Sequence, residues 1–264
     1  MKNKFRRLSD EQRYDASARS EVNNCKENRI EIGVDNFPTY HAPPFLKYYS
    51  RITELITAEM KVLELGIGTG RHSYPLVDTG ANIVGLDISQ ESLTLCAKRN
   101  LGIKLIKGSI EDIPLGDSCM DAIVSCASLS YGNPKLVNAE LLRILKPGGL
   151  IIILDTLNGN KLYVLNRYLK FITGQRSYKS VKNIVNFRRL LFLRNFFNES
   201  HIYYYGSYLW IFPLIKKLVG EMFAIRINGF LESKFPSKKN AFKFVFVGIN
   251  LKQLDKNLKF FDQS

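Results

Sequence analysis

Short apolar runs alternate with amphipathic stretches through the first 156 residues of the chain. The runs lie near 61–65, 82–86, 103–107, 121–126 and 149–155. Apolar runs of this length, bounded by turn residues, are typical of parallel strands that are buried on both faces. The stretches between them have helical apolar spacing, and Ser89 and Asn133 stand where helices would begin. The alternation predicts an α/β fold with a doubly wound, Rossmann-like sheet.

After residue 156 the alternation stops. Residues 157–207 are rich in aromatic and basic side chains, and their apolar spacing is mostly helical. A structureless loop of this length is uncommon inside a compact domain, so we expect a helical cap inserted after the fifth strand. Residues 208–220 then predict a core helix bent at Pro213, and 223–231 and 242–250 predict the last two strands.

A glycine-rich turn follows the first apolar run. Gly66, Gly68 and Gly70 allow the backbone to turn tightly and to approach a ligand. The residues after them predict a helix whose free N–H groups face that ligand. Asp87 ends the second apolar run, where a carboxylate can accept hydrogen bonds from a ribose diol. This arrangement predicts the nucleoside-binding half of a doubly wound sheet.

The spacing of the glycines differs from that of dinucleotide-binding turns. A G-x-G-x-x-G pattern would place its third glycine where the chain has Arg71, and Glu64 before the turn suits a cationic ligand. Here the sequence resembles the class I S-adenosylmethionine-dependent methyltransferases of the type 11 branch. The resemblance continues through 108–115, 119–126 and 140–152. It implies methyl transfer from S-adenosylmethionine and a seven-stranded sheet whose last strand is antiparallel.

The resemblance also implies how the cofactor binds. Its methionine portion would lie over the glycine turn, its ribose on Asp87, and its reactive methyl group near the end of the fourth strand. The residues expected on this basis are Tyr14, Glu64, Gly66, Gly68, Thr69, Gly70, Arg71, Asp87, Ile88, Ser109, Ile110, Cys126 and Ala127. Tyr14 lies in a segment that resembles the Tyr-Asp segment closing over the cofactor in relatives. Ser109 stands where the family often has aspartate, so a backbone group is expected to contact the adenine amino group.

Two histidines are candidates for a general base, which helps when the methyl acceptor is a hydroxyl. His201 lies beside Tyr203–Tyr205 at the end of the expected cap, and His41 precedes the first long helical stretch. A lone histidine is more often structural, so that alternative stays open for both. The end of the fourth strand has no Asn-Pro-Pro-Tyr or Asp-Pro-Pro-Tyr sequence, which argues against DNA bases and protein side chains as acceptors.

These patterns divide the chain into four expected parts. Residues 1–58 form an N-terminal helical segment over the cofactor site, and 59–156 form the S-adenosylmethionine-binding core. Residues 157–207 form the helical cap, and 208–264 form a helix and strands that complete the sheet.

Charge is distributed unevenly between the two halves. The net charge of +14 lies wholly in residues 157–264, and 161–194 contain nine basic residues and no acidic one. This asymmetry predicts an anionic partner, such as a phosphate-linked acceptor or a membrane surface that the basic cap contacts. The alternative is that the charged residues form a solvated helical face.

The four cysteines lack C-x-x-C spacing and no metal-ligand cluster is evident, so we expect no metal. The sequence shows neither a signal peptide nor a long apolar span, and it predicts a cytoplasmic protein.

Several acceptors fit these observations. The leading interpretation is O-methylation of a sugar or glycan precursor, because residues 165–169 and 174–177 resemble segments of enzymes from cell-surface glycan clusters. N- or C-methylation of a specialised metabolite, a peptide or a quinone precursor is the alternative. An RNA methyltransferase is a further alternative, although the chain contains no separate RNA-binding module, which argues against a nucleic-acid partner.

Overall fold

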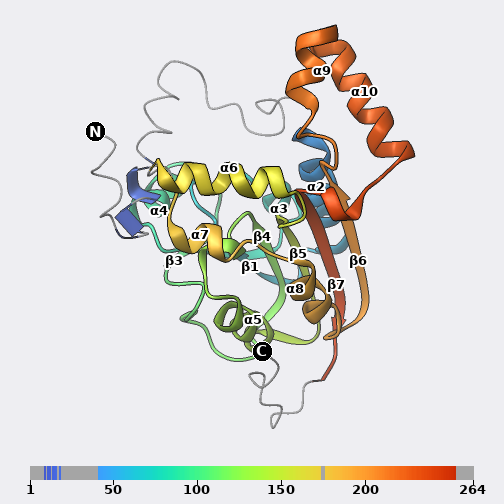
Figure 1. Ribbon diagram of the computed structural model, residues 1–264. Coiled ribbons are helices and arrows are strands. Elements are labelled where there is room, and N and C mark those ends of the chain that lie inside the picture. The colour runs from blue at the N-terminus through green and yellow to red at the C-terminus, as the bar shows by residue number, and fades with distance from the viewer. Residues whose placement is uncertain are drawn as a thin grey trace.

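The computed structural model describes residues 9, 11–12, 14–16, 18, 41–173 and 176–253. Its centre is a seven-stranded sheet with the strand order β3-β2-β1-β4-β5-β7-β6 (Figure 1). The strands are β1 (Lys61–Leu65), β2 (Asn82–Asp87), β3 (Lys104–Lys107), β4 (Met120–Cys126), β5 (Leu145–Thr156), β6 (Phe197–Tyr205) and β7 (Lys243–Leu251). β1 to β5 pair in parallel, and β7 runs antiparallel to both of its neighbours. The expected α/β, Rossmann-like seven-stranded fold is confirmed.

Helices cover both faces of this sheet. One face packs against α2 (Ala42–Leu55), whose Phe45, Tyr48 and Ile52 are buried with residues of β1, β4, β5 and β7. The other face packs against α5 (Pro134–Ile144) and α8 (Phe187–Arg194). Short helices α3 (Tyr74–Val77) and α4 (Gln90–Ala97) follow β1 and β2. Ser89 and Asn133 cap α4 and α5 with their side chains, as their positions in the sequence predict.

The segment after β5 begins as expected and ends differently. α6 (Lys161–Ile172), α7 (Tyr178–Lys182) and α8 follow β5, and the short turn η4 (Leu129–Tyr131) contacts α7. The expected helical cap 157–207 ends earlier than predicted, because its last residues form β6. β6 is an edge strand with several exposed side chains, so it lacks the continuous apolar run of a central strand.

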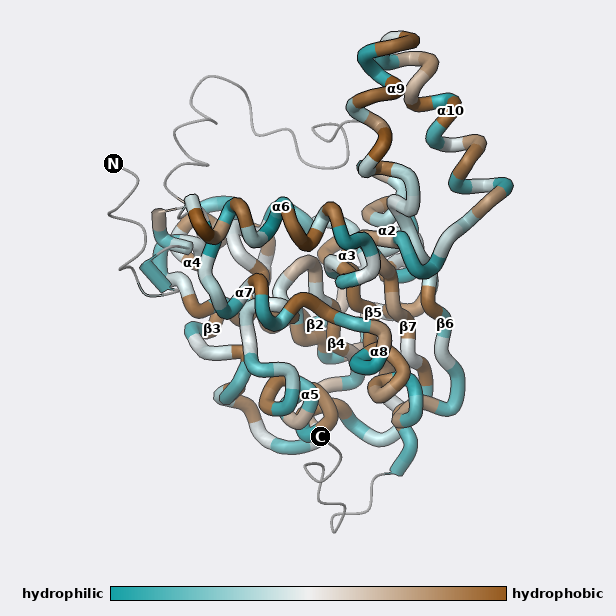
Figure 2. The backbone as a smooth tube through the Cα atoms, in the orientation of Figure 1, coloured by the Kyte–Doolittle hydropathy of each residue, from teal (hydrophilic) through white to brown (hydrophobic). Residues whose placement is uncertain are grey.

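The C-terminal elements also differ from the prediction. Residues 223–231, expected as a strand, lie within α10 (Glu221–Lys234), because a short apolar run does not by itself distinguish a strand from a helix. The expected core helix at 208–220 is also wrong: α9 (Phe212–Val219) buries only Phe212, and Pro213 begins the helix instead of bending it. α9 and α10 form a hairpin that projects beyond the sheet (Figures 1 and 2). The short turn η5 (Lys238–Asn240) leads from it to β7.

Candidate functional site

The glycine turn between β1 and β2 is held in an unusual backbone conformation. Gly66, Gly68 and Gly70 have φ values of 69°, 57° and 74°, which favour glycine. The N–H groups of Gly66 and Ile67 donate to the Leu86 carbonyl at 2.8 and 3.0 Å, which fixes the turn against β2. A Cβ on Gly66 would lie 2.4 Å from Ser128 Cβ, whereas a Cβ on Gly68 would meet no described heavy atom within 4 Å. The backbone at Gly68 therefore faces open space.

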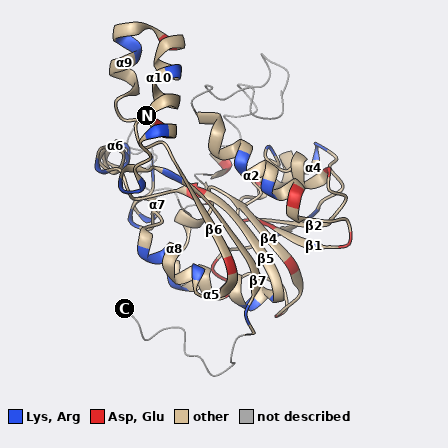
Figure 3. Ribbon diagram, turned by 90° about the vertical axis from the view of Figure 1, so that its right-hand side faces the viewer, with Lys and Arg blue, Asp and Glu red and all other residues tan. Residues whose placement is uncertain are grey.

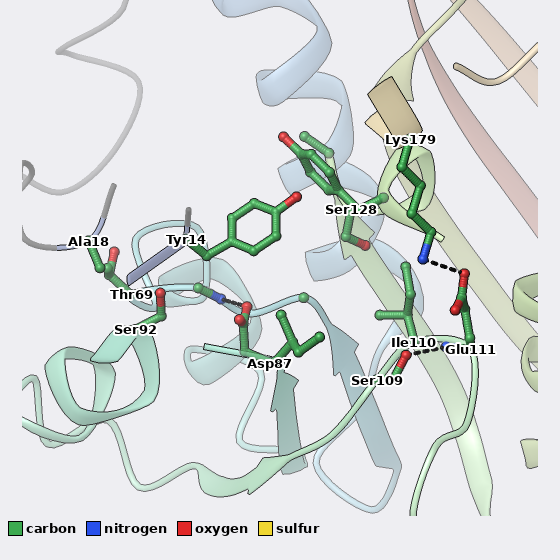
Figure 4. Close-up of a pocket in the computed structure, with 15 residues that line it drawn as sticks. Tyr14, Ala18, Thr69, Asp87, Ser92, Ser109, Ile110, Glu111, Ser128 and Lys179 are labelled. Carbon is green, nitrogen blue, oxygen red and sulfur yellow. Dashed lines mark hydrogen bonds and ion pairs between the residues drawn. The ribbon is translucent and has the colours of Figure 1, made fainter. Parts of the chain in front are cut away.

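That open space is a pocket of about 270 Å³ at the carboxyl ends of β1, β2 and β4 (Figure 4). Of the residues expected to bind a cofactor, the structure brings together Tyr14, Gly66, Gly68, Thr69, Asp87, Ile88, Ser109, Ile110 and Ala127. The pocket is also lined by residues that sequence reasoning did not assign to it: Ala18, Ser92, Glu111, Ser128, Tyr131 and Lys179.

Asp87 connects the pocket to the turn. Its Oδ2 accepts a hydrogen bond from the Gly68 N–H at 2.8 Å, and its Oδ1 accepts one from the Ser89 N–H at 2.9 Å. Burial raises the pKa of Asp87 and these backbone donors oppose that effect. The carboxylate thus holds the turn and faces the pocket from the end of β2.

Glu64 lies deeper, beneath the turn. It is 3% exposed, and its Oε2 has no hydrogen-bond partner among the described residues. Burial raises the pKa of Glu64 to about 7, and the nearby Ser73 hydroxyl acts in the opposite direction. A buried carboxylate oxygen without a donor is suited to a cationic group, such as the ammonium of an amino acid.

Three other expected cofactor residues, together with Glu64, do not line the pocket. Gly70 packs against α4, where a Cβ would lie 2.7 Å from Cys96 Sγ. Cys126 precedes the lining residue Ala127, and burial raises the pKa of its thiol to about 12. Arg71 lies close enough to His72 to lower the pKa of that imidazole.

A short N-terminal segment lies across the pocket. The ring of Tyr14 meets the ring of Tyr131 edge to face, with 5.0 Å between centroids. Asp15 Oδ1 accepts from the Ser89 hydroxyl at 2.5 Å, and Glu11 pairs with Lys107 at 2.6 Å. The rest of the expected 1–58 segment, up to residue 40, lies largely outside the described residues.

The mouth of the pocket is bridged from the cap. Lys179 of α7 pairs with Glu111 at 2.9 Å (Figure 4). The Asn133 N–H donates to the same Glu111 oxygen. Burial, hydrogen bonds and the Lys179 charge all act on Glu111, and its pKa is lowered overall. The sequence could not indicate this pair, because its members are far apart along the chain and lysine is common in 161–194.

The two candidate histidines are not brought to this pocket. His201 is exposed on the edge strand β6 and pairs with Glu199 at 2.8 Å. The expectation that it lies at the end of the cap was wrong for that reason. His41 is the N-cap residue of α2, and its ring lies 6.0 Å, centroid to centroid, from the Phe242 ring. Burial and the Lys243 charge lower the pKa of His41.

A different cluster of aromatic and polar side chains lies beside the end of β4. We call it the Lys243 cluster, and it consists of Phe45, Tyr49, His72, Cys126 and Lys243. The Tyr49 hydroxyl lies 2.6 Å from His72 Nδ1. Burial is the main cause that lowers the pKa of His72 to about 4, so the imidazole is neutral at pH 7, and its tautomer sets the direction of the hydrogen bond with the phenol. Lys243 Nζ lies 4.0 Å from the Phe45 ring centroid and makes no hydrogen bond or ion pair with a described residue. Burial lowers its pKa and the neighbouring Cys126 and Asp155 oppose that shift.

Within the described part of the chain, no group of three or more histidine, cysteine or acidic residues is arranged to hold a metal ion. Across the same residues, none of the helices has the length and apolar composition needed to cross a bilayer.

Comparisons with known proteins agree with this geometry. Residues 63–153 match the family model described as a methyltransferase domain. The chain is 34% identical over 96 residues to a demethylmenaquinone methyltransferase from Renibacterium salmoninarum, covering 36% of this chain and 40% of that protein. It is 33% identical over 103 residues to a malonyl-[acyl-carrier protein] O-methyltransferase from Pectobacterium atrosepticum, covering 38% and 40%. The chain thus spans about two fifths of the length of these curated relatives.

A solved structure extends the similarity of the fold beyond the matched region. It is phosphoethanolamine N-methyltransferase 2 from Haemonchus contortus in complex with S-adenosyl-L-methionine, with a TM-score of 0.60 and 14% identity. The alignment covers 94% of this chain and 60% of that one. The family match runs from within β1 to within β5 and includes most of the residues that line the pocket. The chain therefore contains a class I S-adenosylmethionine-dependent methyltransferase domain of the type 11 branch, as its sequence resemblance implied.

Proposed function

We propose that the protein transfers a methyl group from S-adenosylmethionine to a hydroxyl of a small anionic acceptor, such as a sugar or glycan precursor that carries a phosphate. The observation that carries this proposal is the Lys243 ammonium. It lies beside the end of β4 and makes no ion pair with a described residue, and the buried Asp155 acts on it only electrostatically, so it can bind an anion without first breaking an ion pair.

The pocket residues fit the parts of the cofactor. Asp87 is placed to accept from the ribose hydroxyls, and Glu64 to face the ammonium of the methionine portion. Ile88 and Ile110 supply apolar walls for the adenine, and Tyr14 covers the pocket. S-adenosylmethionine supplies an electrophilic methyl group, so the protein's contribution to direct transfer is mainly alignment of the acceptor.

The acceptor would approach over the Lys243 cluster. Ala127 lines the cofactor pocket and Cys126, the residue before it, interacts electrostatically with Lys243. An anionic group held by Lys243 would thus lie near the side of the pocket where the methyl group is expected. The neutral Tyr49–His72 pair offers hydrogen bonds to the acceptor without a competing charge.

Fewer basic side chains of the cap are available to bind an anionic acceptor than its sequence indicates. Arg167 is buried and its guanidinium lies 3.4 Å from both the Ser180 carbonyl and Thr156 Oγ1. Arg189 is also buried, donates to Asn138 at 3.0 Å, and has a pKa lowered to about 10 by burial. These two arginines therefore fasten the cap to the core, and the exposed lysines of α6 and α7 are the ones available to an anionic acceptor or to a membrane surface.

A quinone precursor is the second candidate, and two apolar cavities favour it. They measure about 290 and 360 Å³ and share His41, Gly206, Leu209 and Phe242. The larger one is also bordered by Asn228, whose buried Oδ1 has no partner among the described residues. Such cavities suit an apolar chain attached to the acceptor. One of the relatives is named as a demethylmenaquinone methyltransferase, which is consistent with this alternative.

An acceptor screen with radiolabelled S-adenosylmethionine tests the proposal. Sugar phosphates should be labelled, and Lys243→Met should raise their KM at least about tenfold, because one charge-assisted contact is lost. Lys104→Met, at an exposed site on β3, is the control and should leave the KM unchanged. Labelling of quinone precursors alone, with no effect of Lys243→Met, would reject the anionic acceptor in favour of the second candidate.

A further inference from the structure

The α9–α10 hairpin is a poorly buried part of the described chain. Its two helices meet at Gly220, which has a φ of 79°. Only Phe212 of α9, and Ala224 and Asn228 of α10, are buried. The hairpin rises beyond the end of the sheet, and its tip lies far from the cofactor-binding strands (Figures 1 and 2).

Large apolar side chains gather at the tip of this hairpin. Leu218, Val219, Met222 and Phe223 flank Gly220 and are 74%, 43%, 68% and 61% exposed. Single exposed apolar residues are ordinary on protein surfaces, but a contiguous group of large ones marks an interaction surface. In Figure 2, hydrophobic positions alternate with hydrophilic ones along both helices of the hairpin.

The apolar tip is accompanied by positive charge. Lys216, Lys217, Arg226 and Lys234 are exposed on the two helices, and Lys238 and Lys239 follow them (Figure 3). The two acidic residues of the hairpin are both engaged: Glu221 pairs with Lys216 at 2.8 Å, and Glu232 accepts from the Tyr208 N–H at 3.1 Å. Exposed apolar residues with a basic surround match the two components of an anionic lipid surface.

We propose that the α9–α10 hairpin docks the protein on an anionic lipid surface. The tip residues enter the boundary between headgroups and acyl chains, and the lysines and arginine contact the anionic headgroups. A second copy of this chain is a poorer occupant, because it would bring an equally basic hairpin against the first. The narrow, projecting tip also suits a deformable surface better than a flat protein face.

The position of the hairpin relates docking to the proposed reaction, and this link alone rests on the proposed function. The residues at its root, Leu209, Trp210 and Pro213, border the smaller apolar cavity, and Ile225 and Asn228 of α10 border the larger one. Phe242, shared by both cavities, is adjacent to Lys243 in the chain. A lipid-borne acceptor would therefore leave the membrane next to the acceptor side of the molecule.

Vesicle co-sedimentation tests the docking surface. The full-length protein should sediment with vesicles of phosphatidylcholine and phosphatidylglycerol, and less with phosphatidylcholine alone. The triple variant Leu218→Ser/Met222→Ser/Phe223→Ser should bind at least about tenfold more weakly, because its apolar side chains no longer enter the interface. Leu136→Ser, at a 43% exposed leucine on α5, is the matched control and should bind as the unmodified protein does.

Fluorescence supplies an independent measurement. Trp210 is the single tryptophan of the chain, so Trp210→Phe/Phe223→Trp places the only indole at the tip. Its emission should shift to shorter wavelength with anionic vesicles, whereas that of Trp210→Phe/Leu136→Trp should not. Lys217→Glu/Arg226→Glu should weaken binding more than the exposed pair Lys104→Glu/Lys135→Glu does.

Three outcomes would overturn the inference. They are absence of binding to anionic vesicles, equal binding by the triple variant, and conversion of a dimer to a monomer by the triple variant in analytical ultracentrifugation. Binding of S-adenosylhomocysteine, measured by calorimetry on each variant, shows that the variants are folded and reports separately on the proposed function.

Discussion

One carboxylate lines the cofactor pocket and another lies beneath the glycine turn, and their different surroundings set what each can do. Asp87 accepts two backbone N–H bonds, from Gly68 and Ser89. Glu64 is buried with an oxygen that has no described donor, and its pKa is raised to about 7. Hydrogen bonds favour an ionised carboxylate and burial disfavours it, so the backbone donors oppose the raised pKa of Asp87, whereas Glu64 lacks such donors.

Replacing Asp87 with alanine should weaken binding of S-adenosylmethionine by roughly 1.5–3 kcal/mol, the range for hydrogen bonds to charged groups. The structure adds a second effect, because the Gly68 and Ser89 N–H groups also lose their acceptor and the melting temperature should fall. Calorimetry and thermal unfolding measure the two effects. Asp78→Ala, at an exposed carboxylate after α3, is the control. Unchanged affinity in the Asp87 variant would remove this residue from the site.

Glu64→Gln should abolish the coupling between cofactor binding and protons. The pKa of Glu64 is raised from 4.5 to about 7 in the folded protein, so the stability tied to its protonation is present below pH 4.5 and lost as the pH rises through 7. A bound ammonium favours the ionised carboxylate, so binding below pH 7 should release a proton, and affinity should rise by up to about tenfold per pH unit between about pH 5 and 7.

Calorimetry in buffers of different ionisation enthalpy counts the protons released. The Glu64→Gln variant should bind more weakly at pH 8 and show no proton release near pH 6. Equal proton release in both proteins would show that Glu64 does not titrate on binding.

At the scale of elements, a few long polar side chains supplement the apolar packing of the cap against the core. Arg189 reaches Asn138 from α8, and Lys179 reaches Glu111 from α7 across the mouth of the pocket. The arginine is buried, whereas the Lys179 and Glu111 side chains are 41% and 22% exposed. Partly exposed ion pairs contribute little stability. Breaking the Lys179–Glu111 pair at the pocket therefore costs little free energy.

Lys179→Met should accelerate dissociation of the bound cofactor about two- to fivefold, which corresponds to loss of an ion pair of up to about 1 kcal/mol. Stopped-flow displacement of S-adenosylhomocysteine measures this rate. Lys182→Met, on the exposed side of the same helix, is the matched control. Rising salt should reduce the difference between the unmodified protein and the Lys179 variant. Identical rates for the two variants would show that the ion pair does not retain the cofactor.

The elements also show how far the sequence could predict the structure. β1, β2, β4 and β5 are buried on both faces, so their residues form apolar runs that are visible in the sequence. β6 lies at the edge and exposes Asn198, Glu199 and His201, so its residues carry no such run. α10 has apolar side chains on its exposed side as well, so residues 223–231 form a short apolar run that could not be distinguished from a strand. Lys243 could not be assigned, because its role depends on Phe45 and Cys126, which lie far away in the chain.

For the whole molecule, the net charge is divided between the same two parts of the chain as cofactor binding and the proposed acceptor binding. The neutral first 156 residues build the cofactor pocket, and the residues after them carry the entire net charge of +14. Figure 3 shows lysine and arginine along α6 to α8 and on the hairpin. An anionic acceptor or lipid surface would therefore be attracted to the side of the molecule formed by the second half of the chain, and rising salt should weaken that attraction.

The position of β7 between β5 and β6 has a consequence for folding during synthesis. β6 leaves the ribosome before β7, yet β7 is the strand that connects it to the sheet. The edge of β5, with its apolar residues Leu150–Leu154, stays unpaired while residues 157–242 are translated, a delay on the order of ten seconds at typical elongation rates. An open apolar edge is a template for association with other chains. The nascent protein should consequently depend on chaperones until residue 251 has emerged, and slow codons within 157–242 should lower its soluble yield.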